Sequence, residues 1–600
     1  MAYGSIVLAA LGIGLLIFVH ELGHFLAARL AGVRVEVFSL GFGPRLFGGT
    51  WKGTDFRVSL VPFGGYVMVA GQDPADRRYP AEQCLWSKSI GQRALFWSGG
   101  VLMNALFALM VFPLVFRAGV AFVAPVVGGV AIGSPAWEVG IQAGDRIRSV
   151  GGKPMYSWEN LTVEIALAGP RPVEIAFERP GEGERRVLVV PRHNRQAGFA
   201  DIGILHSADP APALLTVAAN GPAARAGVRD GDRLLAVDGV AATGASRGDA
   251  LGDLLDGKAT PRLLRVERDG QPQEFRVVPE PVTEQQPLRI GVSPLARRVV
   301  AIRAADPLAA RLGLQRGDVL LAIDGTPFVA NDLAAIANGP APELALTVAR
   351  DGKELLLRQA AAPAERAALA AAVALGQDES LMLTPAEHSP AEAAGLQAGD
   401  VAIAVDGQAV KEWRDLQEAV QRAGEQTLTL QVRRVTGATA MLQITPRRAE
   451  VFDPGLTPRL AELREEVKAG SFGEAVKLGT VCSLDLVKQL YVTMKRMITG
   501  EVAASNLGGI IRISEVSYDA AKRSQSWFWY FLALLSVNLG FVNLLPVPVL
   551  DGGHLLFLLI EKVKGSPVSA RVFGYSQVVG LVFVLLLVLF VTYNDILRLL

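Results

Sequence analysis

Val19-His20-Glu21-Leu22-Gly23-His24 lies inside an apolar run that extends over residues 5–31. On a helix, residues four apart share one face, so His20 and His24 can offer two imidazoles to one metal ion. Glu21 stands beside them and can take a proton from a water that the metal activates. The motif therefore predicts a catalytic metal site on a helix, and two structural histidines are the plainer alternative.

The apolar run around this motif suits a membrane span of about 20 residues. No basic segment precedes Ile6, which distinguishes the run from a signal peptide. Charged and histidine side chains inside a span are costly, and they usually serve a function. The polar residues of this first span are therefore interpreted as chemical groups.

Composition gives the outline of the fold. The chain has 600 residues, of which 50% are hydrophobic, and its two cysteines cannot form a disulfide framework. Its formal net charge of +1 gives no argument for binding nucleic acid. Further apolar spans are expected at 94–116, 527–545 and 578–591. The sequence predicts a polytopic α-helical membrane protein in a lipid bilayer, with four transmembrane helices and a large α/β soluble insert.

Basic residues give the expected orientation of these spans. The segment between the first two spans carries Arg34, Arg45, Lys52, Arg57, Arg77, Arg78, Lys88 and Arg93. By the positive-inside rule, this segment is cytoplasmic. Both termini and the insert are then expected on the outer side, with the metal site near the cytoplasmic side.

Glycines and prolines punctuate strand-like runs in the same segment, at Gly41-Phe42-Gly43-Pro44 and at Pro62-Phe63-Gly64-Gly65-Tyr66. The pattern predicts membrane-associated β-hairpins within the N-terminal membrane half, 1–118. An extended edge there can pair with an unfolded substrate, so Gly64 and Gly65 are candidate substrate-binding residues. An ordinary cytoplasmic loop is the alternative.

Four similar copies of one phrase, which reads Ser-Pro-Ala…Gly-Leu-Gln-Ala-Gly-Asp at 389–400, occur in the middle of the chain. Its last two residues are Gly144-Asp145, Gly231-Asp232, Gly317-Asp318 and Gly399-Asp400. An apolar strand and a tight turn follow each pair. The phrase resembles the PDZ domain, which implies binding of extended peptide or protein ligands by strand addition. We expect tandem PDZ-like units at 119–205, 206–290, 291–370 and 371–450, with size filtering, docking or a spacer role as alternatives.

An amphipathic membrane-proximal region is expected at 451–526, with a break at Ser505-Asn506-Leu507-Gly508-Gly509. In the C-terminal membrane half, 527–600, an apolar run is interrupted by Asn543, Pro546, Pro548 and Asp551. Such interruptions mark sites in membranes. Catalytic zinc takes three protein ligands, so the two histidines need a third. Asp551 is the best candidate, because it is a carboxylate at the same predicted depth in the membrane as the two histidines. His554 is the alternative third ligand.

Together these segments resemble the site-2 protease family. The resemblance rests on the His-Glu-Leu-Gly-His helix, on Asn543 to Pro548 leading into Leu550-Asp551-Gly552, and on PDZ-like units between two membrane halves. It implies an intramembrane zinc metalloprotease with His20, His24 and Asp551 as Zn²⁺ ligands and Glu21 as the base. It also implies that Asn543, Pro546 and Pro548 help to hold the substrate.

The resemblance further implies a bacterial inner membrane protein with a periplasmic PDZ-like region and periplasmic termini. Its implied substrates are single-span membrane proteins, namely anti-sigma factors already trimmed outside and remnant signal peptides. The sequence departs from the family's pattern in having four PDZ-like units in place of two. Gly100-Val101, before Asn104, and Gly509-Ile510 stand where Gly-Pro is usual. These departures leave the metal site intact.

Two other classes of function stay open at this point. A non-catalytic zinc-dependent membrane scaffold would gather proteins through its PDZ-like units and would not need Glu21. A metal transporter would need more carboxylates and histidines along a path through the membrane. Glu21 and Asp551 are the strong intramembrane candidates, which argues against transport.

Overall fold

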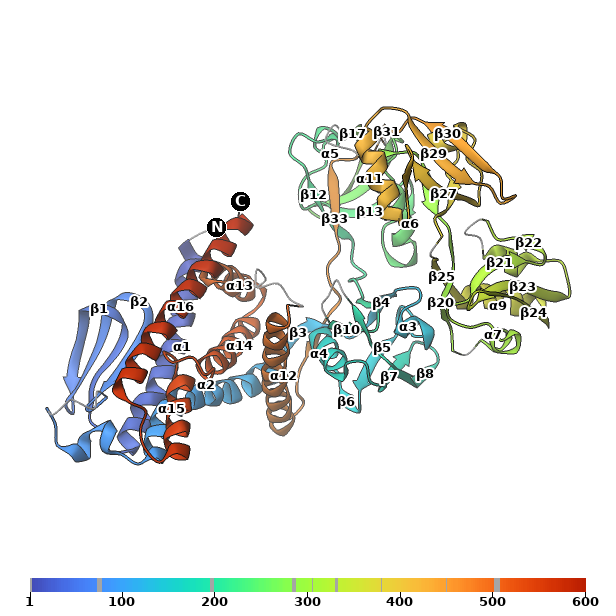
Figure 1. Cartoon of the computed structure of the whole chain (residues 1–600). Helices are drawn as coiled ribbons and strands as arrows, with labels where there is room; N and C mark the ends of the chain where they lie inside the picture. The colour runs from blue at the N-terminus through green and yellow to red at the C-terminus, as the bar shows by residue number, and fades with distance from the viewer. Residues whose placement is uncertain are drawn as a thin grey trace.

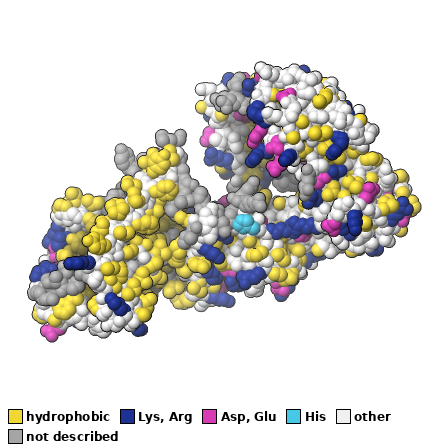
Figure 2. All heavy atoms as spheres, viewed as in Figure 1, with side chains coloured by type: hydrophobic (Ala, Val, Ile, Leu, Met, Phe, Trp, Pro, Cys, Tyr) yellow, Lys and Arg dark blue, Asp and Glu magenta, His cyan; other side chains and the backbone are white. Residues whose placement is uncertain are grey.

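The computed structural model of the chain describes all residues except 1–2, 73–77, 195–198, 283–286, 305, 330–332, 379, 449–450, 501–507 and 600. It consists of a helical body that contains both termini and a β-rich insert beside it (Figure 1). Hydrophobic side chains cover much of the helical body, whereas the insert exposes lysines, arginines and carboxylates (Figure 2). The sequence prediction of apolar ends around a soluble middle is confirmed at this level.

Within the described residues, four helices are long and apolar enough to cross a membrane. They are α1 (Tyr3–Leu30), α2 (Ile90–Ala118), α14 (Gln525–Asn543) and α16 (Ala570–Leu599). These helices coincide with the four predicted spans. The last apolar span is longer than predicted, at Arg571–Leu597, because no proline interrupts the helix after Pro567.

Helix α2 is the centre of the helical body, since it contacts α1, α12 (Phe472–Ile498), α14 and α15 (Asp551–Lys564). Glycines bring α1 and α2 together backbone to backbone. A Cβ added at Gly23 would collide with the carbonyl of Gly99, and one at Gly99 would lie 2.6 Å from the carbonyl oxygen of Gly23. The close crossing places the histidine face of α1 directly against α2.

The predicted β structure between the first two spans is one long antiparallel hairpin, β1 (Val35–Trp51) and β2 (Thr54–Val69). Register shifts interrupt the pairing along its length. Gly41 has a φ of +88° and Gly64 a φ of +100°, values that favour glycine. Both strands contact α1, so the hairpin lies beside the His-Glu-x-x-His helix.

The insert contains four larger sheets in the described residues, each over its own apolar core. The first comprises β5 (Arg146–Val150), β6 (Lys153–Pro154), β7 (Val173–Arg179) and β8 (Gly183–Val189). The main strands of the second are β12 (Ala213–Val217), β13 (Arg233–Val237), β15 (Arg262–Arg268), β16 (Gln271–Val277) and β33 (Leu456–Arg459). Those of the third are β20 (Ala296–Ile302), β21 (Val319–Ile323), β23 (Glu343–Arg350), β24 (Lys353–Ala360) and β25 (Val373–Gln377). Those of the fourth are β19 (Val292–Pro294), β26 (Met382–Pro385), β27 (Asp400–Val405), β29 (Leu428–Arg433) and β30 (Thr439–Ile444).

The repeated Gly-Asp pair has the same structural role in all four units. Each aspartate is buried, accepts a hydrogen bond from a backbone N–H three residues earlier, and forms an ion pair with an arginine. The ion pairs are Asp145–Arg179, Asp232–Arg268, Asp318–Arg350 and Asp400–Arg434. The phrase therefore recurs because it closes the loop that leads into the central strand of each unit.

Some strands pair across the unit limits expected from the sequence. β19 falls in the interval 291–370 but pairs with β26 of the fourth sheet, and β25 falls in 371–450 but pairs with β20 of the third. β33 comes from the expected amphipathic region and pairs with β12 of the second sheet. The third sheet is thus inserted between two strands of the fourth, an arrangement that simple division of the repeat misses.

Several contacts attach the insert to the helical body. The strand that leaves α2, β3 (Val120–Val123), pairs with the returning strand β34 (Arg464–Val467). In addition, Asn160 of α4 (Trp158–Ala168) donates a hydrogen bond to Asp485 of α12 over 2.6 Å. After α12 the chain continues in α13 (Ile510–Arg523). Of the predicted break between them, Ser505-Asn506-Leu507 lies outside the described residues.

Candidate metal centre

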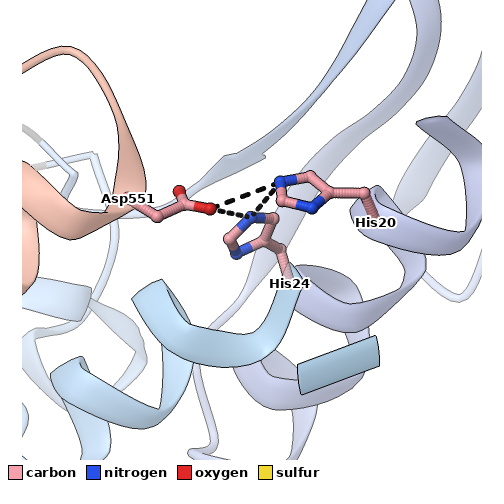
Figure 3. Close-up of side chains that lie close together, drawn as sticks. All are labelled: His20, His24 and Asp551. Carbon is pink, nitrogen blue, oxygen red and sulfur yellow. Dashed lines mark hydrogen bonds and ion pairs between the residues drawn. The ribbon is translucent and has the colours of Figure 1, made fainter. Parts of the chain in front are cut away.

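Three side chains from the two ends of the chain converge inside the helical body (Figure 3). His20 and His24 come from α1, and Asp551 is the first residue of α15. The Nε2 atoms of the two histidines are 3.2 Å apart. Asp551 Oδ2 lies 3.3 Å from Nε2 of His20 and 3.4 Å from Nε2 of His24. The structure thus brings together all three predicted ligands.

This cluster fits a tetrahedral zinc ion on two grounds. With zinc bonds of about 2.0–2.1 Å to nitrogen or oxygen, two tetrahedral donor atoms are about 3.3–3.4 Å apart, which matches the distances within the cluster. Asp551 Oδ2 is also buried and makes no hydrogen bond within the described part of the chain. A carboxylate oxygen held between two imidazole nitrogens without a hydrogen bond is suited to a cation.

Groups of helix α2 contact the Nδ1 atoms of the two histidines. Nδ1 of His24 donates a hydrogen bond to the backbone carbonyl of Phe96 over 2.8 Å, which leaves its Nε2 with a free lone pair. Nδ1 of His20 lies 3.1 Å from the side-chain amide of Asn104. Both rings are therefore oriented by groups of α2, and both turn Nε2 toward Asp551.

Gly100 makes room for this arrangement on α2. A Cβ added at Gly100 would lie 2.5 Å from Nε2 of His24 and would collide with Cε1 of His20. Even the smallest side chain would therefore push the two imidazoles out of place.

Glu21 belongs to α1 and is buried where this helix packs against the hairpin. Its side chain packs against Gly65 of β2, where an added Cβ would lie 2.9 Å from Glu21 Cγ. Only 9% of Glu21 is exposed. Glu21 is consequently next to His20 in the sequence and in contact with strand β2 in space.

The predicted substrate-binding residues lie at different distances from this centre. Asn543 ends α14, and its Nδ2 is 3.3 Å from Nε2 of His20. Gly64, next to Gly65, packs on the ring of Phe42. Pro546 and Pro548 lie in the loop between α14 and α15, where Pro546 is exposed. Asn543 therefore contacts the cluster itself and Gly65 contacts Glu21, whereas the contacts of the described residues include none between the cluster and the two prolines.

Among the described residues, His554 is not part of the group of three side chains that could hold a metal ion. Its ring stacks on Trp97 of α2, with centroids 3.5 Å apart and planes 2° from parallel. Arg93 of α2 forms two hydrogen bonds with Glu561, about two turns further along the same face of α15. These contacts hold α15, and with it Asp551, against α2.

Sequence reasoning missed part of this support. Asn104 stands out in the sequence as a polar residue inside a span, but its contact with His20 could not be foreseen. The carbonyl of Phe96 carries no signal, because every residue has one. Arg93 and Glu561 carry opposite charges and lie at the ends of two apolar segments. These opposite charges are the sequence signal from which their ion pair could have been predicted.

Comparison with known proteins gives one family and several full-length relatives. The model of peptidase family M50 matches residues 8–587. The regulator of sigma-E protease RseP of Salmonella typhimurium (strain 14028s) is 27% identical over 604 residues, which covers 98% of this chain and 97% of that protein. The protein of the same name from Escherichia coli (strain K12) is 28% identical over 596 residues, with the same coverage. A putative zinc metalloprotease of Vibrio cholerae is 26% identical, again over 98% of this chain and 97% of the relative.

Among solved structures, a PDZ domain protein from Parabacteroides distasonis aligns with 56% of this chain and 95% of its own length. Its sequence identity is 10% and its TM-score 0.13, which is too low to support a fold assignment. The PDZ-like nature of the four units thus stays a prediction from the sequence repeat.

Proposed function

This chain belongs to peptidase family M50 and is an intramembrane metalloprotease of the site-2 type, and we propose that His20, His24 and Asp551 bind Zn²⁺ in its active site. The observation that carries the proposal is the meeting of their three ligand atoms, all within 4.8 Å of one another. The family assignment favours the protease over the scaffold and over the metal transporter.

Glu21 is the proposed general base. Bound Zn²⁺ would supply a Lewis acid that polarises the scissile carbonyl and acidifies a water. Glu21 is then placed to hold the proton and deliver it to the leaving amine. Glu21, His20 and His24 are 9%, 8% and 6% exposed, so little bulk water competes for that proton.

The substrate is proposed to cross the centre as an extended segment, because a helical amide is hydrogen-bonded and shielded by its neighbours. Gly65, packed on Glu21, and Asn543, next to His20, are the residues best placed to hold it. The flexible backbone at Gly64 and the loop with Pro546 and Pro548 would shape the two sides of this passage. Strand addition to the hairpin supplies the backbone hydrogen bonds.

The proposed substrates are single-span membrane proteins, such as a trimmed anti-sigma factor and remnant signal peptides. The names of the relatives from Salmonella typhimurium and Escherichia coli, which refer to a regulator of sigma-E, support a role in envelope-stress proteolysis. The four repeated units are proposed to be PDZ-like modules that bind extended ligands or restrict access by size.

An inner membrane location is proposed with the termini and the insert on the periplasmic side. Four helices that all cross the membrane would leave both termini on the same side, and the contacts of α13 with both α1 and α16 support this arrangement. His24 is six residues, or about 9 Å, from the opposite end of α1, which supports a metal site near the cytoplasmic side.

Reconstitution with a single-span model substrate tests the proposed function. The purified full chain is expected to cleave the substrate, to lose activity with a zinc chelator, and to regain it with added Zn²⁺. Glu21→Gln should retain zinc and lose cleavage. Full proteolysis by this variant would remove Glu21 from the mechanism, and cleavage that resists complete zinc removal would refute the metal site.

A further inference from the structure

Asn104 is a fully buried polar residue on α2, one turn after Gly100. Its amide nitrogen Nδ2 lies 3.1 Å from Nδ1 of His20. Its amide oxygen Oδ1 is buried and has no hydrogen-bond partner among the residues that the structure describes. A buried oxygen without a hydrogen bond destabilises a fold, so its presence beside His20 requires a reason.

The chemistry of the histidine supplies that reason. An imidazole that offers the Nε2 lone pair to a metal carries its proton on Nδ1, where it needs an acceptor. With Nδ2 facing Nδ1, two N–H donors would point at each other. A half-turn of the Asn104 amide exchanges its oxygen and nitrogen, so that Nδ1–H of His20 donates to Oδ1.

Two neighbouring contacts agree with this proton position. Asn543 Nδ2, an N–H donor, lies 3.3 Å from Nε2 of His20, which suits a lone pair on Nε2. On the second histidine, Nδ1 of His24 already donates to an oxygen of α2, the carbonyl of Phe96. Helix α2 thus has an oxygen available behind each of the two imidazoles.

We infer that Asn104 is a positioning residue whose side-chain oxygen fixes the Nδ1-protonated tautomer and the ring orientation of His20. The inference rests on the proposed function, in which His20 is a metal ligand. The backbone carbonyl of Asn104 also accepts a hydrogen bond from Ser536 Oγ over 3.0 Å, at the contact between α2 and α14. The side-chain amide of Asn104, by contrast, faces His20 of α1.

Two substitutions separate an acceptor from a donor at this position. Asn104→Asp keeps an oxygen acceptor and loses the N–H donor, whereas Asn104→Leu has nearly the same shape and neither group. Zinc affinity of the purified full chain is measured by competition with a chelator, and the visible spectrum of the Co²⁺-loaded protein reports the ligand geometry. Asn104→Leu is expected to lose about 10–100-fold in zinc affinity with an altered Co²⁺ spectrum, and Asn104→Asp to stay within about threefold of the unchanged protein.

Ser536→Ala is the matched control, because it removes a hydrogen bond at the same helix contact and leaves the Asn104 amide in place. It is expected to keep the zinc affinity and the Co²⁺ spectrum. Failure of the unchanged protein to bind zinc would refute the proposed function rather than this inference. If the unchanged protein binds zinc and Asn104→Asp loses affinity as Asn104→Leu does, or if Asn104→Leu binds normally, the acceptor role is refuted. If Asn104→Leu does not fold, Asn104→Asp alone decides the question.

Discussion

The buried aspartates of the insert and the buried Asp551 of the helical body have different partners. In each unit of the insert the repeated aspartate is 1–3% exposed and lies against an arginine that neutralises its charge. In the helical body, Asp551 faces two histidines, and its Oδ2 makes no hydrogen bond to any described residue. The charge of each repeated aspartate is paired with an arginine of the same unit, although Oδ1 of Asp400 makes no hydrogen bond to a described residue. The charge of Asp551 has no such partner among the described residues, and we propose that a cation balances it.

The comparison separates structural from functional carboxylates by their partners rather than by their burial. A buried aspartate paired with an arginine closes a loop, and loss of the pair weakens the fold. A buried charge without such a partner inside an apolar body is costly, and it is retained where chemistry needs it. Each of the following changes tests one side of this difference.

The largest effect is expected from Asp551→Asn. Loss of the charged ligand should abolish zinc binding and lower the cleavage rate by about 10³-fold or more, because several kcal/mol of transition-state stabilisation are lost. The melting temperature of the metal-free protein should not fall, since no ion pair with an arginine is broken. Zinc content, cleavage of a single-span substrate and thermal unfolding are measured together. Stoichiometric zinc in this variant would end the distinction between the two kinds of aspartate.

Gly100→Ala tests whether His20 and His24 need the space that Gly100 leaves on α2. The added methyl would collide with His20 and should weaken zinc binding by at least about tenfold, as other disturbed ligand supports do. Gly91→Ala on the same helix is the matched control, because an added Cβ there meets no atom within 4 Å. Chelator competition compares the two variants, and equal affinities would contradict the proposed role of Gly100.

Asp232→Asn makes the corresponding change in the insert. Here the expected cost is stability, about 1.5–3 kcal/mol for charge-assisted hydrogen bonds from Arg268, with unchanged zinc binding. Hydrogen exchange of β13 and β15 in the full chain measures the local opening of the second unit. Loss of zinc with unchanged exchange would reverse the expected roles.

The smallest effect concerns pH. Burial alone would raise the pKa of Asp232, but hydrogen bonds from Arg268 and from the backbone N–H of Arg229 outweigh it and lower the pKa below its usual value. A lowered pKa in the folded state means that this stabilisation is complete above the unfolded pKa of about 3.9 and is lost as the pH falls below it. Exchange of the second unit should therefore accelerate below about pH 4, and less steeply in Asp232→Asn. Identical acid profiles of the two proteins would contradict this linkage.

Much of the difference between the helical body and the insert could be predicted from the sequence. The spacing of His20 and His24 and the carboxylate at Asp551 predict three groups that the structure does bring together. Hydropathy predicts four apolar helices, and the Gly-Asp repeat predicts four similar units. These features depend on local pattern and on residue type, which a sequence displays directly.

The remaining features depend on contacts between distant segments. The exchange of β19 and β25 between two sheets follows from packing, and a repeat that divides the chain evenly cannot reveal it. Likewise, the stack of His554 on Trp97 and the approach of Asn104 to His20 follow from the crossing of three helices. The glycines at that crossing are visible in the sequence, but their partners are not.

One zinc ion bound jointly by the two ends of the chain is the proposal on which the other predictions depend. Crystals of the zinc-loaded full chain, measured at the zinc absorption edge, locate the ion. A single strong anomalous peak is expected between the Nε2 atoms of His20 and His24 and the Oδ2 atom of Asp551. A peak at any other cluster of side chains, or none here in protein that contains one zinc per chain, would contradict it.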